Sequence, residues 1–178
     1  MKKKAASEAS SADKKRRILR GSVTAVVLAA LVAADLLLKY AAQKTLSAGR
    51  VIRFGGFIGL RYVENTGAAF SILSEKTAIL SVGTGILLLA VLVVLFSGRV
   101  RSRLLYAALT MVTAGGIGNW IDRLRLGYVI DYIEPLFMRF AVFNFADCLI
   151  TVGAALIVLW LILDTANSAE NKKKESAS

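Results

Sequence analysis

The sequence comprises 178 residues, of which 56% are hydrophobic, and its mean hydropathy of +0.62 is well above that of an ordinary soluble domain. Its formal net charge is +11, with no histidine and one cysteine, Cys148. These counts exclude histidine bases, thiol pairs and the usual zinc sites, so carboxylates are the expected agents of any hydrolytic chemistry.

Four apolar segments are long enough to cross a bilayer, which takes about 20 residues. They cover residues 21–42, 77–96, 104–121 and 146–163. The first follows a basic stretch, as in a signal peptide, but it is too long for that role and ends without a small-residue cleavage site. The sequence therefore predicts an all-α integral membrane protein with four transmembrane helices, the first of them retained.

Basic residues are concentrated on one side of these spans. The segments 1–20, 97–103 and 164–178 hold 14 of the 23 Lys and Arg residues and only five acids. By the positive-inside rule both termini are expected in the cytoplasm. We interpret the positive charge as a topology signal with attraction to anionic membrane lipids, because the aromatic-basic interleaving typical of nucleic-acid binding is missing.

The two ends of the chain differ in composition from the apolar middle. Residues 1–17 and 166–178 are small, polar and charged, which predicts disordered cytoplasmic tails. One membrane domain covering residues 18–165 accounts for the rest.

The loops that face outward contain strand-like runs. Residues 51–54 (VIRF) and 60–63 (LRYV) are β-branched and aromatic, with glycines between them, which favours a small hairpin or sheet at the membrane surface. A further strand is indicated around 128–133, before the only proline, Pro135, which should end it. Residues 68–73 (AAFSIL) follow a turn and are expected to lie in the membrane interface.

The third span ends with small and polar residues. Gly115, Gly116 and Gly118 allow close approach of another helix or of a substrate backbone.

Asn119, Asp122 and Arg123 follow these glycines at helical spacing, and Arg123 has enough donors to orient carboxylates or backbone carbonyls. The alternative is a plain helix end anchored at the lipid headgroups by Trp120 and Arg123, which explains Asn119 poorly.

Two carboxylates at the membrane boundary, Asp131 and Asp147, are costly unless they are paired, and they are therefore functional candidates. Asn144 and Asp147 could also form only a helix-capping pair. Asp131 lies in an apolar strand and has no such structural explanation.

The first span carries Asp35 and Lys39, which are four residues apart on one helical face. We interpret them as an intrahelical ion pair with a structural role. Cys148 is expected to be a packing residue.

Several motifs together resemble the bacterial lipoprotein signal peptidases, known as signal peptidase II. They are DLLLKY, VENTGAAFSIL, GGIGNWIDRLRLGYVIDYI and FNFADCLITVG, in the same order and over residues 20–163. The departures are small: Ser71 stands where the family often has glycine, and Tyr132 where it commonly has phenylalanine.

The resemblance implies a monomeric aspartic endopeptidase of the bacterial cytoplasmic membrane that needs no cofactor or metal. Its substrates would be diacylglyceryl-prolipoproteins, cut just before the lipidated cysteine. The family's catalytic pair falls on Asp131 and Asp147, and its supporting or substrate-binding residues fall on Asn65, Asn119, Arg123 and Asn144, with Asp122 close by.

In such a site two neighbouring carboxylates hold one shared proton near neutral pH, and water attacks the scissile carbonyl directly. Two alternatives remain from the residues alone. Intramembrane acids also serve as proton relays in transporters, and a non-enzymatic membrane scaffold would leave the polar residues unexplained.

Overall fold

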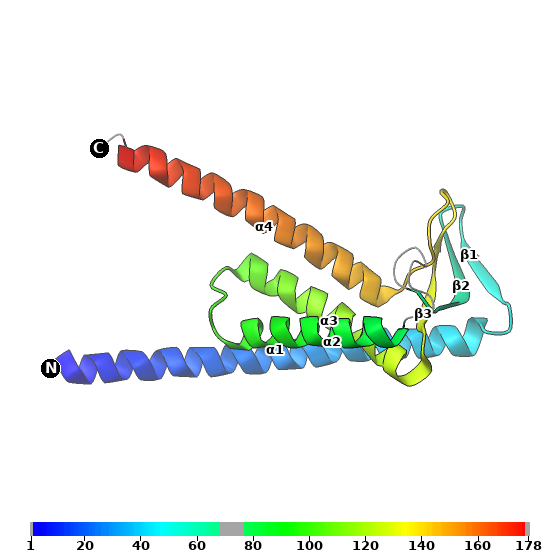
Figure 1. The fold of residues 1–178 in the computed structure, drawn as a ribbon, viewed down its shortest axis with the longest axis horizontal. Helices are drawn as coiled ribbons and strands as arrows, with labels where there is room; N and C mark the ends of the chain where they lie inside the picture. The colour runs from blue at the N-terminus through cyan, green and yellow to red at the C-terminus, as the bar shows by residue number, and fades with distance from the viewer. Residues whose placement is uncertain (1, 68–76, 177–178) are drawn as a thin grey trace.

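The computed structural model of the chain describes the backbone of residues 2–67 and 77–176, and the side chains of residues 11, 14–67, 81–169 and 174. Within these residues the elements follow the order α1-β1-β2-α2-α3-β3-α4 along the chain (Figure 1). The helices are α1 (Lys2–Leu46), α2 (Thr77–Phe96), α3 (Arg103–Leu126) and α4 (Phe145–Ser176), and the strands are β1 (Val51–Phe54), β2 (Ile58–Asn65) and β3 (Val129–Pro135). The predicted interfacial segment 68–73 lies outside the described residues.

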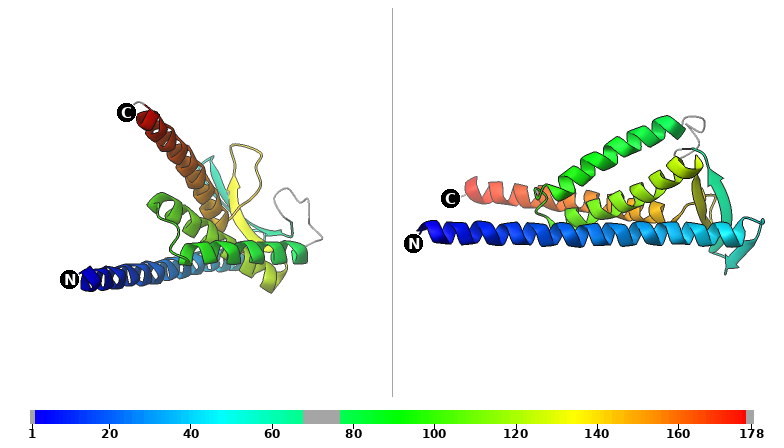
Figure 2. Two further views of the ribbon diagram at one scale, coloured as in Figure 1. Left: turned by 60° about the vertical axis from the view of Figure 1, so that its left-hand side comes forward. Right: turned by 90° about the horizontal axis from the view of Figure 1, so that it is seen from below.

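The small sheet lies at one end of the helices, and both chain ends lie at the other (Figures 1 and 2). The connection between α2 and α3 is also at the end away from the sheet. The basic termini and the basic loop 97–103 therefore share one side, as the charge pattern requires.

Three described helical segments are long and apolar enough to cross a membrane: Lys14–Leu46, Arg103–Leu126 and Phe145–Ala169. Large apolar side chains on their outer faces, such as Ile162 at 62% exposed, are left for lipid to cover. The prediction of a multi-pass membrane protein is confirmed. The structure supports three of the four predicted spans, because α2 contributes only a shorter apolar stretch, Ser81–Phe96, within the described side chains.

The helices continue into both segments for which the sequence predicts disorder. α1 begins at Lys2, and α4 ends at Ser176. The tails are rich in Ala and Lys, which are good helix formers, and extending an existing helix costs far less than nucleating one.

The sheet has the strand order β1-β2-β3, and both pairs are antiparallel. The predicted hairpin is present, and the strand expected around 128–133 joins it as the third strand. The register between β2 and β3 shifts between Leu60 and Val63, so that Val63 lies opposite Asp131. As predicted, the third strand ends at Pro135.

A small apolar cluster fastens the sheet to the end of α1. Ala42 and Leu46 of α1 pack with Tyr132 of β3, and all three are at most 7% exposed. Because Tyr132 follows Asp131 and side chains alternate along a strand, the Asp131 side chain projects to the opposite face from Tyr132.

Three glycines of α3 each face a different helix of the bundle. An added Cβ would collide with the Ala146 carbonyl oxygen at Gly115, with Leu88 at Gly116 and with Asp35 at Gly118. The sequence predicts either another helix or a substrate backbone next to these glycines. The structure shows neighbouring helices, which fill the space beside all three.

Candidate active site

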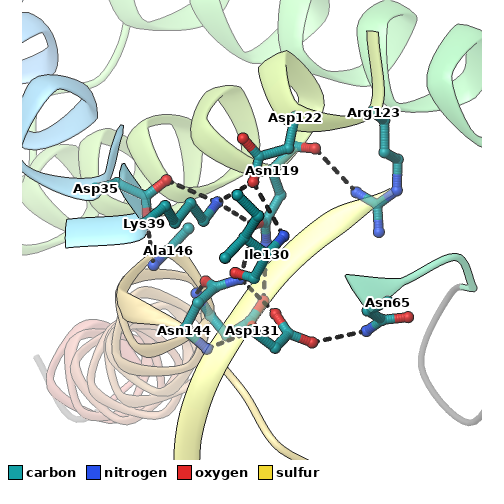
Figure 3. A network of polar contacts seen from close by, with 11 residues as sticks. Asp35, Lys39, Asn65, Asn119, Asp122, Arg123, Ile130, Asp131, Asn144 and Ala146 are labelled. Carbon is teal, nitrogen blue, oxygen red and sulfur yellow. Dashed lines mark hydrogen bonds and ion pairs between the residues drawn. The ribbon is translucent and has the colours of Figure 1, made fainter. Parts of the chain in front are cut away.

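Asp131 lies on β3 and is only 2% exposed. Asn65 Nδ2 donates to its Oδ2 at 2.9 Å, and Asn144 Nδ2 donates to its Oδ1 at 2.7 Å (Figure 3). The Asn65 amide is itself oriented by the Gly67 N–H, which donates to its Oδ1 at 3.0 Å. Burial raises the pKa of Asp131 to about 6; the Asn65 hydrogen bond acts against this shift, and the negative charge of Asp147 adds to it.

Asp147 lies in the first turn of α4 and is half-buried. It forms a reciprocal cap with Asn144: its N–H donates to Asn144 Oδ1 at 2.9 Å, and the Asn144 N–H donates to its Oδ2 at 3.1 Å. Its Oδ1 accepts a hydrogen bond from Asn119 Nδ2 at 2.8 Å. The predicted capping pair of Asn144 and Asp147 is therefore present. Asn119 and Asn144 also connect this pair to other polar groups.

Asn144 is the residue that joins the two aspartates. Its side chain is fully buried at 0% exposed. Besides donating to Asp131, its Nδ2 donates to Asn119 Oδ1 at 3.1 Å and to the Ile130 carbonyl oxygen at 3.3 Å. One side chain and its own backbone N–H thus contact both Asp131 and Asp147, so their spacing depends on this residue.

The predicted ion pair between Asp35 and Lys39 is present, with 2.8 Å between Nζ and Oδ2, and both side chains are buried. It is not an isolated intrahelical pair. The Lys39 ammonium also lies 3.0 Å from Asp122 Oδ2 and donates to Asn119 Oδ1 at 2.8 Å (Figure 3). The first span therefore contributes directly to the polar network around the two aspartates.

Asp122 and Arg123 make different hydrogen bonds at the edge of the polar network. Asp122 Oδ2 accepts a hydrogen bond from the Ile130 N–H at 3.2 Å and so supports the start of β3. Arg123 Nη1 donates to the Asn119 carbonyl oxygen at 3.4 Å. A backbone carbonyl is one of the two kinds of acceptor that the sequence predicts for Arg123.

Trp120 does not have the surface position expected for a headgroup anchor. Its indole Nε1 donates to the Ser81 carbonyl oxygen at 2.7 Å, and its ring packs against Gly85 of α2. Trp120 therefore attaches α2 to α3, next to the polar network. Sequence reasoning missed Ser81 and Gly85, since nothing in an apolar span marks a contact to a residue about 40 positions away.

The described residues include no group of three or more His, Cys, Asp or Glu side chains placed to hold a metal ion. The carboxylates of Asp131 and Asp147 instead accept hydrogen bonds from amide groups of Asn65, Asn119 and Asn144. Cys148 is a half-buried free thiol beside Asp147 in sequence.

Comparison with known proteins decides the family. The profile of signal peptidase II matches residues 27–163, which is most of the chain. The chain belongs to the signal peptidase II family. It is therefore a membrane protease, and the resemblance stated from the motifs is confirmed.

Individual relatives agree with this assignment. The lipoprotein signal peptidase of Enterococcus faecalis is 38% identical over 148 residues, covering 83% of this chain and 92% of that protein. The lipoprotein signal peptidase of Streptococcus pyogenes is 42% identical over 132 residues, covering 74% and 87%. A solved structure titled as a bacterial membrane enzyme has a TM-score of 0.76 at 30% identity, covering 82% of this chain and 91% of that one.

The matched region of this peptidase contains every polar residue of the network, from Asp35 to Asp147. Membership of a peptidase family removes the transporter and the scaffold as explanations of that network.

Proposed function

We propose that this peptidase removes the signal peptide from prolipoproteins that carry a diacylglyceryl group, and that it cuts just before the lipidated cysteine. Relatives named lipoprotein signal peptidase, similar over most of their length, support the substrate class. The observation that carries the proposal is that Asn144 contacts both acids: its side-chain Nδ2 donates to Asp131 Oδ1, and its backbone N–H donates to Asp147 Oδ2.

Asp131 and Asp147 form the proposed catalytic pair. Two carboxylates held close together do not both ionise cheaply, so the pair shares one proton. Asp147 lies at the positive end of the α4 dipole and is the more exposed of the two. The buried Asp131, whose pKa is raised, is then the member that holds the proton at rest.

This assignment gives each acid a role in peptide hydrolysis. Asp147 accepts a proton from the water molecule that attacks the scissile carbonyl carbon. Asp131 donates a hydrogen bond to the carbonyl oxygen as negative charge develops on it, and its proton is available for the departing amine. No covalent intermediate or metal is required.

The supporting residues have separate roles in this proposal. Asn119 donates a hydrogen bond to Asp147, and Asn144 donates one to Asp131. Asn65 donates to the other carboxylate oxygen of Asp131. Asp122 fixes β3 through the Ile130 N–H. Arg123 has guanidinium donors beyond the one used on α3, and we assign them to carbonyl groups of the substrate.

The proposed location is the bacterial cytoplasmic membrane, with α2 as the fourth span and the enzyme acting as a monomer. Both termini face the cytoplasm, because basic residues flank that end of the helices. The sheet and the two aspartates then lie near the outer face, where a translocated precursor first exposes its cleavage site. The peptidase region covers residues 18–165.

The lipid is the feature that should select substrates. Two acyl chains partition strongly into a bilayer, at about 0.8 kcal/mol per buried CH₂, and they would hold the cysteine at the depth of the aspartates. Purified protein should therefore cleave a diacylglyceryl precursor far faster than the same precursor without lipid. The product mass should correspond to cleavage just before the modified cysteine. Equal rates for the two precursors would overturn the proposed selectivity.

A further inference from the structure

Lys39 has a buried ammonium group with three close polar partners. The side chain is 2% exposed. Its Nζ lies 2.8 Å from Asp35 Oδ2, 3.0 Å from Asp122 Oδ2 and 2.8 Å from Asn119 Oδ1. The contact with Asn119 is a hydrogen bond, and the contacts with Asp35 and Asp122 are ion pairs. Lys39 cannot turn toward another acceptor without giving up one of these contacts.

One of the three partners leads to the side chain of Asp147. Asn119 presents its Oδ1 to Lys39 and its Nδ2 to Asp147 Oδ1 at 2.8 Å. The ammonium decides which way this amide faces, because an NH₂ group cannot lie against a cation that has only donors. The positive charge of Lys39 thereby directs a hydrogen-bond donor onto Asp147.

The other two partners lead to the backbone beside each aspartate. Asp35 Oδ1 accepts a hydrogen bond at 3.0 Å from the N–H of Ala146, the residue before Asp147. Asp122 uses the same Oδ2 that meets Lys39 to accept a hydrogen bond at 3.2 Å from the N–H of Ile130. Ile130 is the residue before Asp131, so all three routes from Lys39 end at, or one residue from, a proposed catalytic acid.

We infer that Lys39 is a positioning residue for the proposed reaction: its ammonium holds Asp131 and Asp147 in the arrangement in which they share a proton. The inference rests on the proposed function, and it goes beyond a structural ion pair within α1. A helix-stabilising pair would need only Asp35, four residues away. Lys39 also contacts Asp122 and Asn119 of α3, and these two residues connect it to β3 and α4.

The charge of Lys39 also acts on the pair through space. The charged groups around Asp131 are Asp147 from α4, Asp122 and Arg123 from α3, and Asp35 and Lys39 from α1, while β2 contributes the uncharged Asn65. Burial raises the pKa of Asp131, and the positive charge of Lys39 lowers it. Removing that charge should therefore move the titration of the pair to higher pH.

The test compares Lys39→Met with wild-type enzyme on a diacylglyceryl precursor in detergent. The substitution leaves an unbranched side chain one atom shorter and removes its charge and donors. We expect kcat to fall about 100-fold, as for other misplaced catalytic groups. KM should stay within about threefold, since ground-state binding is not affected. The pH optimum of the residual kcat should shift upward, and a merely structural role would leave that optimum in place.

Lys44→Met, an exposed lysine on the same helix, is the matched control and should keep wild-type kinetics. The double variant Lys39→Met/Asp35→Asn keeps charge balance in case the single variant does not fold, and it should be folded yet slow. Wild-type kcat and pH optimum in either Lys39 variant would overturn the inference, and so would failure of both to fold. If wild-type enzyme itself fails to cleave, the proposed function is what has failed.

Discussion

Asn144 Nδ2 and Asp131 Oδ1 lie 2.7 Å apart, although one residue caps α4 and the other lies in the middle of β3. Both side chains are at most 2% exposed. A buried carboxylate is expensive unless it is hydrogen-bonded, and this bond satisfies one of its two oxygens. The contact therefore joins the sheet to the last helix at the point where the proposed chemistry takes place.

The predicted topology can be checked by labelling introduced cysteines in a Cys148→Ala background. Gly56→Cys in the hairpin should react with a membrane-impermeant thiol reagent outside spheroplasts, because nothing lies within 4 Å of this position. Ser168→Cys, an exposed position near the C-terminal end of α4, should react only after the membrane is opened. The reverse pattern would contradict the topology.

Close packing between α3 and α4 should make Gly115→Ala destabilising. Its Cβ would meet the backbone carbonyl oxygen of Ala146, which can yield only if α4 moves. Overpacking of this kind costs about 1–3 kcal/mol. Thermal denaturation in detergent measures the effect, and Gly83→Ala on α2, with nothing within 4 Å, is the control. A similar melting temperature for both variants would refute the packing argument.

Asp35→Asn should lower stability more than turnover. The substitution breaks a buried ion pair with Lys39 and leaves the ammonium one charged partner fewer, a change that costs about 3 kcal/mol. The Asn oxygen can still accept from Ala146. Thermal denaturation and kcat of the surviving protein separate the two effects, with the exposed Asp164→Asn as control. Unchanged stability with lost turnover would assign Asp35 to the chemistry instead.

The raised pKa of Asp131 predicts how stability depends on pH. Folded protein keeps the Asp131 proton up to about pH 6, whereas unfolded protein releases it near the ordinary aspartate pKa of 3.8. Between these values the folded state binds more protons, so the free energy of unfolding falls as pH rises. The loss amounts to about 3 kcal/mol and is complete above the folded pKa.

Denaturation of wild type and of Asp131→Asn at several pH values isolates this contribution. The Asn side chain does not titrate, so the difference between the two curves should change between about pH 4 and 6 and stay constant above. A constant difference across the whole range would show that Asp131 ionises normally in the folded state.

Much of the site could be predicted from the sequence because its signals are local. Asp131 in an apolar strand is anomalous by itself, and Asn144 and Asp147 form a cap from two residues that are three positions apart. Asp35 and Lys39 are likewise a pair within one turn of helix. Patterns of this range need no knowledge of how the helices pack.

The rest of the site depends on long-range contacts, for which a single sequence has no signal. Lys39 contacts Asn119, which is 80 residues away in the sequence. Trp120 donates a hydrogen bond to the backbone carbonyl of Ser81, and a backbone group leaves no pattern in the sequence. Arg123 is expected to orient carboxylates or backbone carbonyls, and only the structure places its hydrogen bond on a carbonyl of its own helix.

The most direct test of the central claim is the cleavage rate of Asp131→Asn and Asp147→Asn on a diacylglyceryl precursor. Each amide keeps the shape of the carboxyl group but cannot share the proton, so each variant should lose at least about 10³-fold in kcat. Both should remain folded by thermal denaturation, and Asp164→Asn should cleave like wild type. A near wild-type rate in either folded variant would contradict the assignment of Asp131 and Asp147 as the catalytic pair.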